Sequence, residues 1–283
     1  MKIVLPAFCL FVSINVYAQS GKPLFTQHPG VVSFTYRNYF AKDVAKTLDS
    51  LLVPNGFTDI EFSNLFGKTA AQLREMIDTR GIKCSSFGVG YDDFVNKIDT
   101  IATNAKILGA QYVRISSLPH KGAFTLDDAN KAIELFNRQG KYLKEKYGLT
   151  FIYHDHGFEF EPYKDGTLYD YIVQNTNPKY VSFELDILWA YFPGQDPAKL
   201  LEKYGSRYKA LHLKNIKSGV PGNMSGGTDG NNEVSLGKGV IDIPAVLKAA
   251  KKAHIKHYYI EDESNNVVVQ VPESIAYLKS LTE

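Results

Sequence analysis

The chain has 283 residues, of which 44% are hydrophobic. Its length suits either two small domains or one barrel of eight strand–helix units, a fold of about 250 residues. Lys and Arg (32 residues) nearly balance Asp and Glu (30 residues), so the formal net charge is only +2. A chain without a basic excess lacks the electrostatic field of nucleic-acid-binding proteins, and we expect no nucleic-acid partner.

The first 19 residues have the pattern of a signal peptide. Lys2 supplies a charged start, residues 3–12 form an apolar stretch, and residues 16–18 provide a small-residue cleavage signal. The apolar stretch is too short to span a bilayer, so we expect no stable membrane insertion after cleavage. The pattern predicts export, with the bacterial periplasm as the expected compartment. Cys84 is then the single remaining cysteine, which excludes an internal disulfide.

Beyond this segment, short apolar runs alternate with segments of helical periodicity, without a linker or a shift in composition. The predicted strands are residues 30–36, 57–62, 83–89, 112–115, 149–153, 181–185, 208–213 and 257–260. The predicted helices are residues 42–52, 69–79, 92–108, 125–147, 168–175, 197–204, 243–253 and 273–281. Eight alternations in one chain predict an α/β fold, the parallel (β/α)₈ or TIM barrel.

Two features of the loops refine this prediction. An open doubly wound sheet is the alternative fold, but residues 36–39 read Tyr-Arg-Asn-Tyr instead of the glycine fingerprint expected after its first strand. Residues 218–239 are rich in Gly and Asn and contain no phosphate-cradling GxxxxGK motif followed by Ser or Thr. We therefore expect this segment to be a mobile loop over a site.

Polar side chains gather where the last four predicted barrel strands end. The carboxyl ends of barrel strands carry the chemistry in this fold. The residues concerned are His154, His156 and Glu159 after the fifth strand, Asp186 after the sixth, His212 and Lys214 at the seventh, and Glu261 after the eighth. Each alone has an ordinary structural explanation, such as a helix cap or a solvated charge. Together they predict a site for a divalent cation, Mn²⁺, Mg²⁺, Co²⁺ or Zn²⁺.

Several of these segments resemble one known family. The motifs are residues 153–160 (YHDHGFEF), Leu185-Asp186 followed by Trp189, residues 211–214 (LHLK) and residues 260–262 (IED). They are similar to the xylose-isomerase-like superfamily of sugar isomerases and epimerases, and the similarity spans essentially all of the chain after the signal peptide. The resemblance implies a single TIM-barrel domain over residues 20–283, and family members often form homodimers.

The resemblance also implies one divalent metal, often manganese, bound by Glu, Asp, His and Glu from strands five to eight. Asp186, His212 and Glu261 match three of these ligands. The fourth position departs from the family pattern, because His154 stands where a glutamate is expected. Either His154 takes the coordination site, or Glu159 folds back from the loop to supply the carboxylate.

The candidate ligands suggest roles for their neighbours. His156 is the expected general base, because it lies two residues beyond His154 and imidazole works as a base near neutral pH. Lys214 is placed to steady a developing oxyanion, and Glu261 to share in proton transfer. We assign Arg114, Glu61 and Trp189 to substrate binding.

Three functions remain open at this point. The first is a metal-dependent isomerase or epimerase of a free sugar or keto-sugar, which removes a proton beside a metal-polarised carbonyl. The second is a lyase or hydratase of a keto-sugar or keto-glycoside, which the histidine pair favours because it suits one-sided proton abstraction. The third is a non-catalytic sugar-binding protein. Nucleases of the same superfamily need three zinc ions and a cationic groove, and seven histidines with a nearly neutral charge argue against them.

Overall fold

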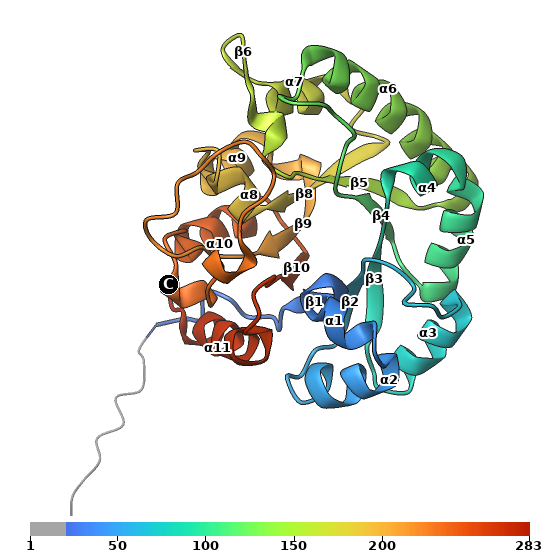
Figure 1. Ribbon diagram of the computed structural model, residues 1–283, viewed down its shortest axis with the longest axis vertical. Helices are drawn as coiled ribbons and strands as arrows, with labels where there is room; N and C mark the ends of the chain where they lie inside the picture. Colours follow the sequence, from blue (N-terminus) through green and yellow to red (C-terminus); the bar gives the residue numbers. More distant parts are fainter. Residues whose placement is uncertain (1–20) are drawn as a thin grey trace, which may run out of the picture.

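The computed structural model describes residues 21–283, and the predicted signal peptide lies outside the described residues. Eight parallel strands form a closed barrel in the order β1-β10-β9-β8-β5-β4-β3-β2, which confirms the predicted (β/α)₈ fold (Figure 1). The strands are β1 Gly30–Val32, β2 Asp59–Phe62, β3 Lys83–Val89, β4 Tyr112–Ile115, β5 Thr150–His154, β8 Val181–Asp186, β9 Tyr208–Leu213 and β10 His257–Ile260.

The helices form an outer layer around the strands, as the ring of helices α3 to α7 in Figure 1 makes plain. They are α1 Arg37–Phe40, α2 Val44–Thr47, α3 Ala70–Asp78, α4 Tyr91–Asn96, α5 Ile98–Leu108, α6 Leu126–Tyr142, α7 Leu168–Asn175, α8 Ile187–Tyr191, α9 Pro197–Tyr204, α10 Ile243–Lys252 and α11 Val267–Ser280. Single π-helical turns extend α2 to Leu52 and α6 to Tyr147. None of the helices within residues 21–283 combines the length and apolarity needed to cross a bilayer.

Local sequence explains where several helices begin. Thr69, Thr125 and Thr167 each accept a hydrogen bond from the backbone N–H three residues on, and the side chain of that residue accepts one in return. Asp196 caps α9 ahead of Pro197 at the first helical position, as the sequence predicts. These caps satisfy backbone donors that have no partner within the helix.

Several elements differ from the sequence prediction. The first strand ends at Val32, and residues 33–36 form a 3₁₀ turn instead. The helix α8 directly after β8 was not predicted, nor was the small hairpin of β6 (Pro162–Tyr163) and β7 (Gly166–Thr167). The closing helix α11 begins at Val267 and includes Pro272, whereas the sequence predicts its start at residue 273.

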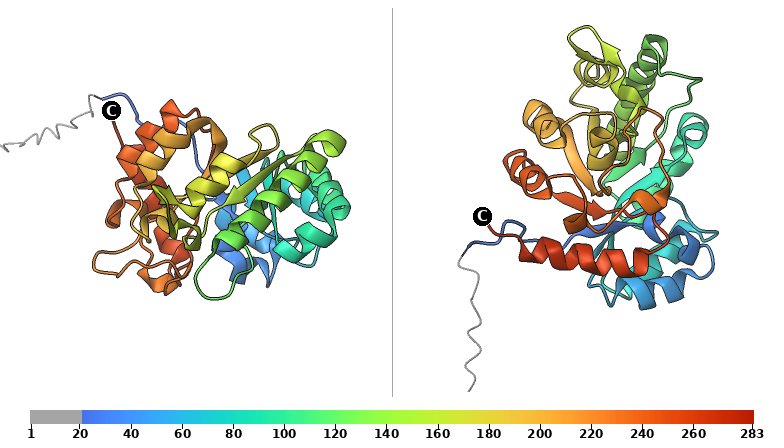
Figure 2. Two further views of the ribbon diagram at one scale, coloured as in Figure 1. Left: turned by 90° about the horizontal axis from the view of Figure 1, so that it is seen from above. Right: turned by 60° about the vertical axis from the view of Figure 1, so that its left-hand side comes forward.

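The two ends of the described chain lie together on one side of the barrel (Figure 2). The backbone N–H of Leu24 donates to the carbonyl of Leu281, and that of Glu283 donates to the carbonyl of Lys22. The first and last barrel strands pair directly, with Val31 opposite Ile260. Closure therefore joins residues more than two hundred positions apart and leaves no open edge on the barrel.

The strand register brings the polar residues of the rim together. Asp186 pairs with His212 across β8 and β9, and His154 pairs with Glu184 across β5 and β8. The register shifts by one residue just before Glu61 and again just before Glu184. Irregularities of this kind re-aim side chains and are common next to active sites.

Candidate metal centre and active site

Four side chains meet at the carboxyl rim of the barrel. One ligand atom from each of His154, Asp186, His212 and Glu261 lies within 4.8 Å of the other three, and all four residues are buried. Asp186 Oδ2 lies 3.8 Å from His154 Nε2 and 3.9 Å from His212 Nδ1, and His212 Nδ1 lies 2.9 Å from Glu261 Oε2. Ligand atoms around a tetrahedral zinc ion are about 3.4 Å apart, given bonds of about 2.1 Å. The spacing of the four residues therefore fits a single divalent cation.

Asp186 shows most clearly how the fold aims a ligand at this point. Its Oδ1 caps α8, accepting from the backbone N–H of Leu188 (2.8 Å) and of Trp189 (3.0 Å). Its Oδ2 is buried and has no hydrogen-bond donor in the described part of the chain. A buried carboxylate oxygen without a donor carries a large desolvation cost unless a cation compensates it. Burial raises the pKa of Asp186 to about 6, although the nearby Lys214 opposes that shift.

The two histidines are held by one carboxylate behind them. His154 presents Nε2 to the four-residue group while its Nδ1 lies 3.2 Å from Glu184 Oε2. His212 presents Nδ1 to the group while its Nε2 lies 3.1 Å from the same Glu184 oxygen and 3.0 Å from Glu61 Oε1. Metal-bound histidines usually donate their second ring N–H to a carboxylate, which fixes the tautomer and the ring orientation. Both rings show this arrangement.

Arg114 links these two carboxylates inside the barrel. Its Nε lies 2.6 Å from Glu61 Oε1 and 3.4 Å from Glu184 Oε2, with both acids fully buried. The charge of Arg114 and a hydrogen bond to His212 outweigh the effect of burial and hold the pKa of Glu61 below its usual value. Of the three residues assigned to substrate binding, Arg114 lines the cavity described below, while Glu61 lies behind it.

Lys214 is buried among four carboxylates. Its Nζ lies 2.6 Å from Glu263, 3.1 Å from Glu261, 3.5 Å from Glu233 and 3.8 Å from Asp186. Burial alone would lower the pKa of Lys214, but these acids hold it well above its usual value. The side chain is not among the residues that line the cavity, and its described contacts are with these carboxylates, so its predicted role toward an oxyanion stays a prediction.

Glu233 reaches Lys214 from the loop of residues 218–239. This carboxylate is buried, and its Oε2 accepts a hydrogen bond from the backbone N–H of Glu263 at 3.1 Å. Earlier in the same loop, a Cβ built on Gly226 would lie 3.2 Å from Nδ1 of His156. The loop that the sequence predicts over a site therefore packs directly against site residues.

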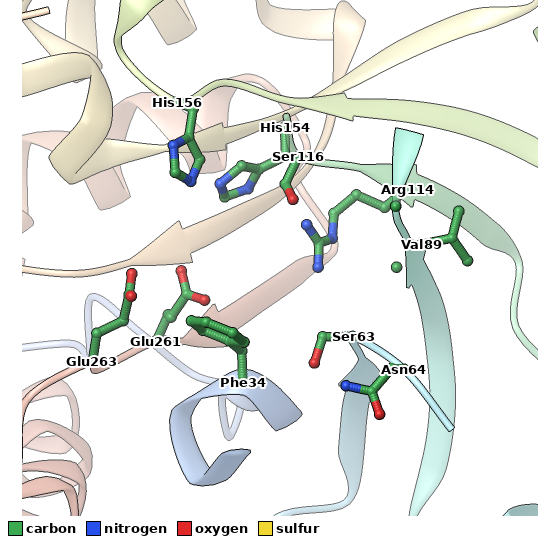
Figure 3. Close-up of a pocket in the computed structure, with 12 residues that line it drawn as sticks. Phe34, Ser63, Asn64, Val89, Arg114, Ser116, His154, His156, Glu261 and Glu263 are labelled. Carbon is green, nitrogen blue, oxygen red and sulfur yellow. The ribbon is translucent and has the colours of Figure 1, made fainter. Parts of the chain in front are cut away.

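A cavity of about 290 Å³ is lined by two residues of the four-residue group, His154 and Glu261 (Figure 3). His154 and His156 line one side, and Glu261 and Glu263 line another. The ring of His156 stacks on Trp189 with centroids 5.1 Å apart, so Trp189 supports His156 from behind. Burial, reinforced by the charge of Lys214, lowers the pKa of His156 to about 4. Its imidazole is therefore neutral near pH 7 and has a lone pair available.

Glu159, the alternative fourth ligand, is directed elsewhere. Its carboxylate accepts a hydrogen bond from the hydroxyl of Tyr153. Its Oε2 also accepts one from the backbone N–H of His156, at 3.1 Å. Burial raises the pKa of Glu159 to about 7 despite these donors. Of the two alternatives that the sequence left open, His154 is the one that joins Asp186, His212 and Glu261. Glu159 instead holds the turn that carries His156.

Sequence reasoning overlooked two of these acids, Glu184 and Glu233. Glu184 lies within the run 181–185, which was treated as an apolar strand. A charged residue two positions before Asp186 on a fully buried strand faces the same side as Asp186, and that alternation was the available signal. Glu233 lies in a long irregular loop, where spacing along the sequence carries no information on side-chain direction.

These features define a (β/α)₈ barrel with a candidate metal centre at its carboxyl rim. A model of the xylose isomerase-like TIM barrel family matches residues 50–281 of the chain. The match covers well over half of the sequence, and the protein belongs to this family.

Curated relatives that match include inosose dehydratases. The chain is 24% identical over 190 residues to inosose dehydratase of Bacillus cereus (strain AH820), a match that covers 58% of this chain and 61% of the relative. It is 25% identical over 165 residues to inosose dehydratase of Geobacillus thermodenitrificans (strain NG80-2), covering 54% and 52%. The similarity thus spans between half and two thirds of the length of these relatives.

Solved structures with the same fold cover nearly all of the chain. A sugar phosphate isomerase/epimerase from Parabacteroides distasonis ATCC 8503 has a TM-score of 0.74 at 20% identity, covering 90% of this chain and 99% of that one. The IOLI protein, whose crystal structure holds a zinc atom, has a TM-score of 0.70 at 17% identity, covering 89% and 95%. An L-ribulose 3-epimerase has a TM-score of 0.65 at 15% identity, covering 89% and 93%. At these identities the likeness concerns the fold.

Proposed function

We propose that the protein is a divalent-metal-dependent isomerase or epimerase of a free sugar or keto-sugar, acting by proton transfer at the carbon beside a carbonyl. The observation that carries this proposal is the meeting of four candidate ligands beside one cavity, which two of them, His154 and Glu261, line together with His156. The sugar isomerases and epimerases of the same fold support it.

In this proposal His154, Asp186, His212 and Glu261 hold the cation. A divalent ion bound there supplies a Lewis acid that polarises the substrate carbonyl and acidifies the neighbouring C–H bond. We expect manganese, on the family resemblance, with Zn²⁺, Co²⁺ and Mg²⁺ as alternatives. Two imidazoles in the ligand set suit zinc well, and the zinc atom in the IOLI protein supports that alternative.

The side chains of this protein then have distinct tasks. His156 accepts the proton from one face of the bound sugar, and Glu261 serves the opposite face, because the two residues line different sides of the cavity (Figure 3). Arg114 lines the same cavity and has N–H groups that can donate to a sugar hydroxyl. Lys214 keeps Glu261 ionised through a hydrogen bond of 3.1 Å. His156 can return the proton to the neighbouring carbon, which isomerises the sugar. Inversion of one carbon instead needs a different proton, taken up by Glu261 from water, to be delivered to the opposite face.

A lyase or hydratase acting on a keto-sugar or keto-glycoside is the second candidate. The observation that favours it is His154, which replaces a carboxylate that the family pattern places among the ligands. Without that carboxylate, a single base on the histidine side removes the proton and a neighbouring hydroxyl or alkoxyl group leaves. The match to inosose dehydratases supports this alternative.

Hydrogen exchange separates these functions. We would incubate the Mn²⁺-loaded and Zn²⁺-loaded protein with a panel of hexoses and keto-sugars in D₂O and record NMR and mass spectra. An isomerase or epimerase places deuterium at one carbon of a product of otherwise unchanged composition. A lyase or hydratase gives a product that has lost water or an alcohol. Failure of every sugar to exchange would refute both and favour the non-catalytic sugar-binding protein.

We further propose export to a bacterial periplasm, with removal of the residues up to Ala18 or Gln19, and assembly as a homodimer. Export is supported by the amino-terminal sequence pattern, and the dimer by the family resemblance. Mass spectrometry of the protein from fractionated native cells tests the first, since an intact Met1 in the cytosolic fraction contradicts it. Light scattering during size exclusion tests the second.

A further inference from the structure

A second cavity of about 360 Å³ continues outward from the first. The two cavities share five lining residues from the ends of β2 and β3 and the loops after them, namely Ser63, Asn64, Gly88, Val89 and Gly90. The outer cavity then extends over Leu65 to the α5 residues Thr100 and Asn104. Together they form one groove that leads from the candidate metal centre to the outer helix layer.

Glycines keep the shared section open. A Cβ on Gly90 would meet no atom within 4 Å, so this position borders open space. A Cβ on Gly88 would lie 2.5 Å from Nη2 of Arg114, so glycine lets the guanidinium lie against β3. Figure 3 shows Ser63 and Asn64 on the side of the inner cavity away from His156. A ligand bound beside His156 therefore meets the outer cavity at its far end.

The charges along this groove do not suit a phosphate. Among the described residues that line the two cavities, the lysine and arginine side chains are Arg114 and Lys97. Arg114 is already paired with Glu61 and Glu184, and Lys97 Nζ lies 2.9 Å from Asp93. Phosphate sites typically use unpaired Arg or Lys groups.

Backbone donors do not replace these missing cations. The helix α4 begins beside the groove, but it has only six residues and carries Asp92 and Asp93 in its first turn. Those carboxylates, together with Glu261 and Glu263 of the inner cavity, repel a dianion. The groove therefore disfavours a phosphorylated sugar.

The uncharged groups of the outer cavity suit a sugar or an aromatic ring. Thr100, Asn104 and Asn64 offer a hydroxyl and two amides, and Leu65, Val89 and Ile101 offer apolar surface. Sites with mostly apolar walls and a few oriented polar groups are typical of small-molecule recognition. We propose, building on the function proposed above, that the substrate is an uncharged keto-glycoside, with the reacting keto-sugar ring in the inner cavity and its ring-sized substituent in the outer cavity.

Binding measurements on the Zn²⁺-loaded protein test this proposal without requiring turnover. The probes are D-glucose, D-galactose and D-mannose, their 6-phosphates and their phenyl glycosides, followed by calorimetry and saturation-transfer NMR. At least one phenyl glycoside should bind about tenfold or more tightly than its parent sugar, since a tenfold gain needs only about 1.4 kcal/mol. Its phenyl protons should receive saturation from the protein, and the 6-phosphates should bind no more tightly than the parent sugars.

A matched pair of variants on α5 locates the substituent. Thr100→Trp fills the outer cavity, whereas Thr103→Trp places the same side chain at an exposed position of the same helix that does not line it. Thr100→Trp should weaken binding of the phenyl glycoside about tenfold and leave the parent sugar unchanged. Thr103→Trp should change neither.

The proposal is overturned if no phenyl glycoside binds more tightly than its parent sugar, if a 6-phosphate binds best, or if both variants behave alike. These outcomes are separate from the fate of the proposed function. Glycoside binding that depends on Thr100, without any deuterium exchange, would refute the isomerase and lyase and leave the groove assignment standing. Exchange with free sugars, without preference for a glycoside, would support the proposed function and refute the groove assignment.

Discussion

Glu184 Oε2 stands 3.2 Å from Nδ1 of His154 and 3.1 Å from Nε2 of His212, at the centre of the barrel. One carboxylate thus serves the inner nitrogens of both candidate ligands. Burial, followed by the nearby charge of Glu61, raises the pKa of Glu184 to about 7. A group in this position can orient both rings without belonging to the group of His154, Asp186, His212 and Glu261.

Replacing Glu184 should therefore weaken metal binding without reaching the ion directly. We expect Glu184→Gln to lower the affinity of the protein for Zn²⁺ about 10- to 100-fold, the usual effect of losing such a supporting carboxylate. Competition with a fluorescent chelator measures it. The control is Glu134→Gln, which removes an exposed acid on α6 and should leave affinity unchanged. Equal affinities in the two variants would show that Glu184 does not orient the ligands.

For His156 we expect the opposite result to that for Glu184: replacing it should slow catalysis while metal binding is retained. It is not one of the four clustered residues, yet it lines the cavity. We expect His156→Ala to keep stoichiometric metal and to slow substrate hydrogen exchange about 10²-fold or more, the range of a general base. Exchange in D₂O and elemental analysis measure the two effects. His254→Asn, at an exposed surface position, is the control. Undiminished exchange in the His156 variant would move the base role to Glu261 or His154.

Three of the four candidate ligands could be located from the sequence, and the fourth could not. The positions of Asp186, His212 and Glu261 follow from strand ends, because consecutive strands of a barrel bring their carboxyl ends to one rim. The choice between His154 and Glu159 did not follow, since it depends on a turn at Gly157 with φ of 97° that directs Glu159 to the hydroxyl of Tyr153. Chain spacing alone does not encode such a turn.

At the scale of elements, buried strands and capped helices were the most predictable parts. The bounds of β3, β4, β9, β10, α7 and α9 agree residue for residue with those expected from the sequence. The helix α8 was missed because the sequence prediction ended the strand at residue 185 and assigned no element to residues 187–191. The Asp186 that caps this helix is also a candidate ligand. The start of α11 was missed: the sequence prediction begins this helix at residue 273, whereas the helix starts at Val267 and continues through Pro272.

The contact between α7 and α9 leads to a prediction on pH dependence. Asp170 of α7 accepts hydrogen bonds from Lys203 Nζ at 2.8 Å and from the hydroxyl of Tyr204 at 2.6 Å, both on α9. Burial would raise the pKa of Asp170, but these two donors outweigh it and hold the pKa below 3.8. Because the folded-state pKa is depressed, its stabilising effect is complete above about pH 4 and is lost as pH falls through the folded value.

We expect Asp170→Asn to lower the free energy of unfolding by about 1 kcal/mol at pH 7. The expected loss is this small because the Lys203 side chain is half exposed, so that solvent screens its ion pair with Asp170. The difference from the wild type should shrink at pH 3, where the wild-type carboxyl is losing its charge. Urea unfolding at the two pH values measures it. Asp127→Asn, at an exposed position on α6, should show little difference at either pH. A penalty that grows on acidification would contradict the assignment.

At the scale of the whole molecule, the alternation of apolar runs and helical segments was enough to predict the closed barrel. The polar interior was not predicted. Glu61, Arg114, Glu184 and His212 fill a level of the barrel that hydrophobic side chains usually occupy. Such a buried ionic layer is costly unless its charges are matched. The structure matches them by pairing each acid with a base across different strands, which sequence periodicity does not reveal.

The unmatched part of this charge lies at the rim, and it gives the last prediction. Asp186, Glu233, Glu261 and Glu263 surround one lysine, Lys214, so a divalent cation would offset much of the remaining negative charge. A ligand that binds only the folded state stabilises it by about 4.1 kcal/mol at 1,000 times its dissociation constant. For a domain of this size that corresponds to a rise in Tm of roughly 10 °C. We expect saturating Zn²⁺ or Mn²⁺ to produce a rise of this order in differential scanning fluorimetry, and a chelator to reverse it.

Two aspartates on neighbouring elements provide a matched comparison for this effect. Asp186 caps α8 and Asp196 caps α9, each through Oδ1. Asparagine is as good a helix cap as aspartate, so both substitutions preserve the cap. The two aspartates differ in the surroundings of Oδ2. Oδ2 of Asp186 lies among the candidate ligands, whereas Oδ2 of Asp196 is at the surface beside Lys199. Asp196→Asn should keep the full metal-dependent rise in Tm, and Asp186→Asn should lose most of it. A full rise in the Asp186 variant, with stoichiometric metal by elemental analysis, would place the cation elsewhere in the protein.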